Sequence, residues 1–94
     1  MGSLLGVHDV PEVGRPWPEG RALVPADIAP WLVLRHGGRS TDSWKRYSCA
    51  DDEQEAVDRF KAVEAAMRQG GVVLVDPDGV VRARAWAPRL RTRW

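Results

Sequence analysis

Five of the seven prolines in this 94-residue chain lie within its first thirty residues. Their spacing, at positions 11, 16, 18, 25 and 30, excludes a helix interior or a central strand, because proline fixes φ and lacks the backbone donor that both structures use. We therefore expect residues 1–30 to be an extended segment. Short apolar groups around Leu4, Trp17 and Leu23 favour a belt that lies across the folded part, and disorder of the first dozen residues is the alternative.

Residues 52–69 carry the clearest helical pattern in the chain. Apolar residues recur at helical spacing from Val57 to Met67, which predicts a helix with one narrow apolar stripe. Asp51 is a suitable N-cap, with Gln54 as its capping-box partner. Gly70-Gly71 supplies the glycine that commonly follows the end of a helix.

Four short segments flank this helix, two on each side, and their length, residue types and bounding residues are typical of strands. They are Trp31–Leu34, Trp44–Cys49, Val72–Val75 and Val80–Trp86. Between the last two runs lies Asp76-Pro77-Asp78-Gly79, in which Pro77 presets φ and Gly79 supplies a left-handed position. This stretch predicts a tight turn joining two antiparallel strands.

The order of these elements is ββαββ. It predicts an α+β fold of two layers, with the helix packed on one face of an antiparallel four-stranded sheet. Residues 31–94 are expected to form this single domain, and residues 1–30 to form a proline-rich segment that partly covers the other face of the sheet.

The formal net charge of +1 hides a segregation of charge along the chain. The helical stretch 51–70 holds six acidic and three basic residues, whereas residues 71–94 hold five arginines and two aspartates. A protein that coats nucleic acid is usually far more basic overall. Arginine is also common here while lysine, asparagine and isoleucine are scarce, a bias typical of GC-rich genomes that explains part of the arginine content without any ligand.

The last predicted strand and the residues beyond it form the main candidate binding surface. Alternation places Arg82, Arg84 and Trp86 on one face and Val81, Ala83 and Ala85 on the other. We expect the first set to face outward, because the small residues suit the side beneath the helix. The predicted surface also includes Arg89, Arg91, Arg93 and Trp94 from the chain end, with Trp44 and Arg46 from the second strand.

Arginine and tryptophan together suit two kinds of macromolecule. Both residues are enriched among the anchors of protein interfaces, and an edge strand can pair with a partner sheet or with a second copy of itself. Aromatic platforms beside basic groups also bind single-stranded nucleic acid, where stacking contributes roughly 1–3 kcal/mol per base. We therefore expect a small non-enzymatic binding or accessory module that contacts protein, and the alternative is a nucleic-acid-binding protein.

No motif in the chain points to catalysis, a cofactor or a metal. His8, His36 and Cys49 lack the paired spacing of a metal site, and no serine sits in a nucleophile elbow. An enzyme would instead need a pocket where His36, Cys49 and a carboxylate converge. The single cysteine, the absence of an apolar run of ~18–20 residues and the lack of a signal-peptide pattern favour a cytoplasmic protein that does not engage membranes.

Overall fold

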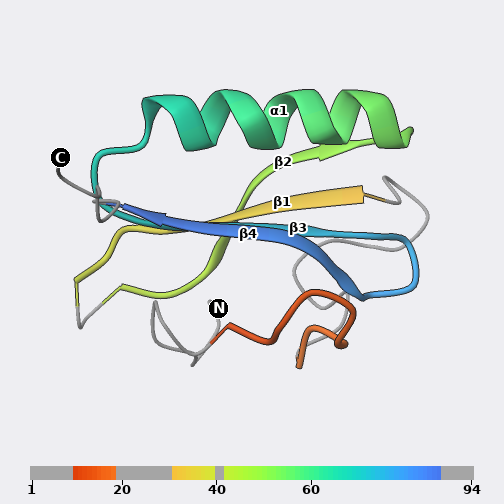
Figure 1. Ribbon diagram of the computed structural model, residues 1–94, viewed down its shortest axis with the longest axis horizontal. Helices are drawn as coiled ribbons and strands as arrows, with labels where there is room; N and C mark the ends of the chain where they lie inside the picture. The colour runs from red at the N-terminus through yellow and green to blue at the C-terminus, as the bar shows by residue number, and fades with distance from the viewer. Residues whose placement is uncertain (1–9, 19–30, 40–41, 88–94) are drawn as a thin grey trace, which may run out of the picture.

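The protein forms one antiparallel sheet with a helix across one face, as a computed structural model describes for residues 10–18, 31–39 and 42–87 (Figure 1). The elements are β1 (Trp31–His36), β2 (Lys45–Ala50), α1 (Glu53–Ala66), β3 (Gly70–Val75) and β4 (Val81–Ala87). All neighbouring strands are antiparallel, in the order β2-β1-β3-β4. The predicted two-layer ββαββ fold is thereby confirmed. The division of the chain at residue 30 stays a prediction, because residues 19–30 lie outside the described ranges.

The helix is shorter than predicted at both ends. Its N-cap is Asp52, whose side chain accepts a hydrogen bond of 2.8 Å from the backbone N–H of Glu55, so the predicted Asp51 cap is wrong by one residue. At the other end the chain leaves the helix at Met67, which is extended. Gly70 then turns the chain into β3 with a φ of +89°. Residues 67–69 form the connection between α1 and β3, so the predicted helix end at position 69 is wrong by three residues.

The sheet is buried on both faces. Beneath α1, the described residues of the core are Val33, Ala50, Ala56, Phe60, Val63, Val72, Leu74 and Ala85. On the opposite face, they are Val10, Trp17, Leu32, Leu34, Trp44, Val73, Val75 and Val81. Every residue of β3 is consequently buried, as expected for a strand that carries a core on each side.

Residues 10–18 cover the face opposite the helix, as the belt interpretation predicts for this part of the N-terminal segment. Backbone bonds run from Gly14 N to Val81 O at 2.8 Å and from Trp17 N to Gly79 O at 2.7 Å. The Trp17 ring packs edge-on against Trp44, with 5.5 Å between the ring centroids. The segment therefore adds backbone pairing to the first part of β4 as well as apolar contact. Within the described ranges, no helix is long and apolar enough to cross a membrane.

Two β-bulges break the side-chain alternation assumed from the sequence. In β4, Leu74 pairs with Ala83 and Val75 with Val81, which leaves Arg82 as the extra residue. Val81 consequently packs on the same face of the sheet as Trp86. The prediction that Val81 shares a face with Ala83 is therefore wrong.

The second bulge lies in β2. Val33 pairs with Ser48 and Leu34 with Arg46, which leaves Tyr47 unpaired between them. Cys49 packs on the face covered by residues 10–18, whereas Tyr47 lies beside α1. Strict alternation along β2 would place Tyr47 and Cys49 on one face of the sheet, and the bulge is why they lie on different faces.

Candidate binding surfaces

The arginine–tryptophan pair of β4 is engaged within the protein. The Arg84 Nη1 donates to the backbone oxygens of Val10 at 2.9 Å and Pro11 at 3.0 Å. The same guanidinium lies over the Trp86 ring, 5.1 Å from its centroid, an arrangement typical of a cation–π contact. Both side chains are half-buried. The pair thus fastens the N-terminal segment to the sheet, where the sequence analysis expected an open surface.

Arg82 forms an ion pair with a buried carboxylate in the neighbouring turn. Its Nη1 lies 3.3 Å from Oδ2 of Asp76, which is only 5% exposed. The other oxygen of Asp76 accepts backbone N–H groups from Asp78 and Val80, each at 2.9 Å. The carboxylate therefore holds the predicted turn closed, and the Arg82 side chain stays about half exposed to solvent.

The remaining predicted surface residues do not join this row. Trp44 is completely buried against Trp17. Arg46 is exposed, but it lies on β2 at the edge of the sheet opposite β4. Arg89, Arg91, Arg93 and Trp94 lie outside the described residues.

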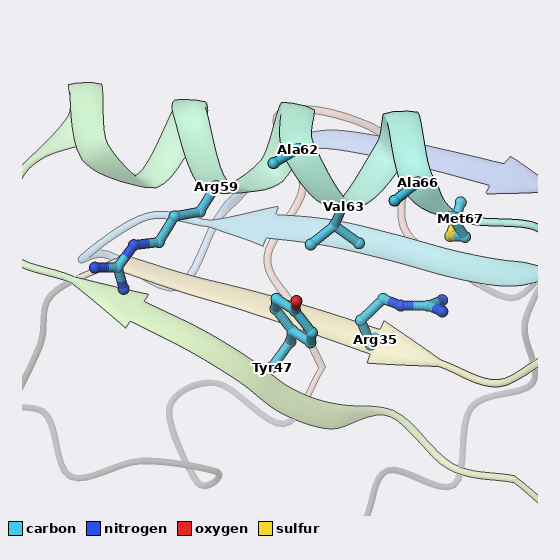
Figure 2. A pocket seen from close by; sticks show the side chains of 7 residues that line it. All are labelled: Arg35, Tyr47, Arg59, Ala62, Val63, Ala66 and Met67. Carbon is cyan, nitrogen blue, oxygen red and sulfur yellow. The ribbon is translucent and has the colours of Figure 1, made fainter.

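A second candidate surface lies along β2, where its side chains meet the flank of α1 (Figure 2). An open hollow of about 300 Å³ has a helical wall of small and apolar side chains, with Arg35, Tyr47 and Arg59 around it. The helical wall consists of Ala62, Val63, Ala66 and Met67. Tyr47 stands between the two arginines and is 61% exposed, one of two large hydrophobic side chains that the described residues leave in solvent.

Both arginines beside Tyr47 are held by protein groups. Arg59 donates to Ser48 Oγ and to the Cys49 carbonyl, each at 2.6 Å, and pairs with Glu55 at 2.6 Å. The Arg35 Nη1 lies 3.0 Å from the carbonyl oxygen of its neighbour and 3.1 Å from that of Gly71. These contacts restrict two long side chains, so a ligand at this place would meet cations that are already positioned.

A shallower hollow of about 410 Å³ opens where β1 ends and β2 begins. Lys45 and Arg46 border it, together with Asp42 and Ser43. His36 lies at its base and is 2% exposed. The Nδ1 of His36 accepts the backbone N–H of Gly38 at 2.9 Å, and its Nε2 is buried without a hydrogen-bond partner among the described residues. The ring also packs against Trp44 at 5.3 Å, so this histidine is a structural side chain under a basic rim.

Sequence reasoning missed Tyr47 as a surface residue, because strict alternation paired it with the inward Cys49. No local signal marks the bulge that turns it outward. Among the described residues, no three or more His, Cys, Asp or Glu side chains gather closely enough to hold a metal ion. Comparison of the chain with known protein families, curated proteins and solved structures finds no match.

Proposed function

We propose that this protein is a small non-enzymatic binding module that contacts another protein through the β2 flank. The β2 flank is the surface made by Lys45, Arg46, Tyr47, Arg35, Arg59 and the exposed alanines 62 and 66. One observation carries the proposal: an exposed tyrosine borders an apolar hollow between two arginines that the protein holds in place.

The chemistry of this flank is that of a protein interface. Tyrosine and arginine, together with tryptophan, are enriched among the few interface residues that supply most of the binding energy. Ala62 and Ala66 leave space beside the Tyr47 ring for an apolar side chain of a partner. Because Arg35 and Arg59 are already restrained, less conformational entropy is lost when a partner binds.

The same surface is less suited to binding nucleic acid. Stacking requires open aromatic faces, yet Trp17 and Trp44 are buried and the guanidinium of Arg84 lies over Trp86. Within the described residues, Tyr47 is left as the exposed aromatic ring. The near-neutral net charge also supports a protein partner. A cytoplasmic location belongs to this proposal, on the sequence arguments given above.

Site-specific photocrosslinking tests the proposal. A photoreactive phenylalanine analogue replaces Tyr47 in one sample and Val13, which is 56% exposed on the segment across the sheet, in a control sample. We expect discrete protein adducts from position 47 and none from position 13, and we expect Arg46→Glu to remove them. Adducts to nucleic acid that vanish as salt rises would establish the alternative. Equal labelling from both positions would refute a specific role for the β2 flank.

A further inference from the structure

The two ends of the β2 flank carry opposite charge. Lys45 and Arg46 begin the strand, whereas Asp51 and Asp52 directly follow its last residue. The helix then runs back above the strand, so that Glu55 lies at the acidic end of the flank (Figure 1). The flank therefore carries an excess of cations at the start of β2. At the other end, where Glu55 pairs with Arg59, Asp51 and Asp52 leave an excess of carboxylates.

Side-chain contacts confirm the antiparallel arrangement of strand and helix that creates this polarity. Arg59 reaches from the helix to Ser48 and to the Cys49 carbonyl, near the end of β2. Ala66 and Met67 share a hollow with Tyr47 and Arg35, toward the start of β2. The acidic first turn of α1 thus lies at the end of β2, and the last turn of the helix lies toward the start of β2.

We propose that the partner of the β2 flank is a second copy of this chain, placed antiparallel to the first about a two-fold axis near Tyr47. This inference rests on the proposed function, because it names the partner for the same surface. A two-fold axis across a bipolar edge brings the basic end of each copy to the acidic end of the other. The pairs form twice, once at each end, whereas a parallel arrangement would oppose like charges.

The available edges of the sheet favour this surface for self-association. Residues 14–17 already pair with the beginning of β4, so that edge is partly occupied. The outer edge of β2 has no strand beside it among the described residues. The bulge at Tyr47 interrupts the regular spacing of backbone groups, which opposes a long ladder of main-chain bonds across the two copies. Side chains therefore make the contact, with the two Tyr47 rings and the alanines of each helix at its centre.

Two charge-reversal variants test the arrangement. The first carries Lys45→Glu and Arg46→Glu, and the second carries Asp51→Lys and Glu55→Lys, which leaves the Asp52 helix cap intact. All four positions are exposed, so both variants should fold, and far-UV circular dichroism checks this. We expect the wild-type protein to self-associate in sedimentation equilibrium and each variant to do so roughly tenfold or more weakly, because like charges then face each other.

Mixing the two variants is the decisive step. In the mixed pair, the reversed ends face each other with opposite charges, so we expect a heterodimer with close to wild-type affinity, and its affinity should fall as salt rises. A control variant with Arg15→Glu and Lys61→Glu changes the net charge by the same amount and sign as the first variant, at exposed positions outside the flank, and should associate like the wild type.

The outcomes separate this inference from the proposed function. A wild-type protein that stays monomeric at millimolar concentration, or a mixture with no gain over the separate variants, overturns the self-association proposal. Photocrosslinks from position 47 to a different protein would then still support the binding function. If adducts from position 47 and self-association are both absent, the two proposals fail together.

Discussion

Replacement of Trp17 by alanine measures whether the N-terminal segment is part of the folded domain. Trp17 is 2% exposed, and its ring meets Trp44 edge-on. Truncation of a buried aromatic side chain costs about 3–5 kcal/mol. One term opposes this loss: Trp17 Nε1 is buried without a hydrogen-bond partner among the described residues, and such a group costs about 1–3 kcal/mol that truncation relieves. Taking the middle of each range, we therefore expect Trp17→Ala to lower the free energy of unfolding by about 2 kcal/mol.

Urea unfolding followed by far-UV circular dichroism checks the size of this loss. With an m-value of about 1–3 kcal/mol/M, the transition midpoint should fall by roughly 1–2 M. Trp17→Phe keeps an aromatic ring against Trp44 and removes the unpaired N–H, so we expect a change within about 1 kcal/mol. Val13→Ala, on the exposed part of the same segment, should change stability by less than about 0.5 kcal/mol.

Amide exchange locates the effect of Trp17→Ala in the structure. The Val81 N–H donates to Arg15 O at 2.9 Å, so its exchange should accelerate selectively when the segment loosens. A stability loss no larger than that of Val13→Ala, with unchanged exchange at Val81, would refute the conclusion that residues 10–18 are an integral layer.

Five further substitutions, at four positions, probe particular contacts. Gly70→Ala places a Cβ against the backbone oxygen of His36 at positive φ, and we expect a loss of about 3 kcal/mol or more in thermal unfolding. Gly14→Ala has a similar φ but open space around it, so it should cost about 1–2 kcal/mol, and equal costs at the two glycines would contradict this account. Asp76→Ala should cost about 1–3 kcal/mol in urea unfolding, while Asp76→Asn, which keeps an acceptor for the turn amides, should cost clearly less. Arg84→Lys cannot both bridge two carbonyls and cover a ring, so hydrogen exchange in residues 10–18 should accelerate, and an unchanged exchange rate would show that Arg84 does not anchor the segment.

The helix and the turn between β3 and β4 were predictable from the sequence, because residues close together in the chain determine them. The helix followed from the apolar spacing between Val57 and Met67 and from the aspartates before it. Gly79, with a φ of +84°, closes the turn as expected, with its N–H bonded to Asp76 O at 2.9 Å. Asp51 and Asp52 are equally suitable caps, so a one-residue error between them reflects a choice that local chemistry does not make.

For the edge strand β4, the sequence predicted only in part which side chains lie on which face of the sheet. In β4, alternation correctly placed Ala83 and Ala85 beneath the helix, because that end of the strand is regular. It failed at Val81, since the Arg82 bulge arises from pairing with β3 and not from the sequence of β4 alone.

For the candidate site too, the sequence predicted some features and the tertiary structure decided others. Composition identified arginine and aromatic side chains as the groups with binding chemistry, and the order of the elements determined the ββαββ layers. Which aromatic ring stays in solvent was decided by contacts between distant segments: Trp17 packs on Trp44, and Arg84 closes over Trp86. Burial of a side chain depends on which segment covers it. Strand pairing and the docking of residues 10–18 therefore determined that Tyr47, and not Trp44, is exposed to solvent.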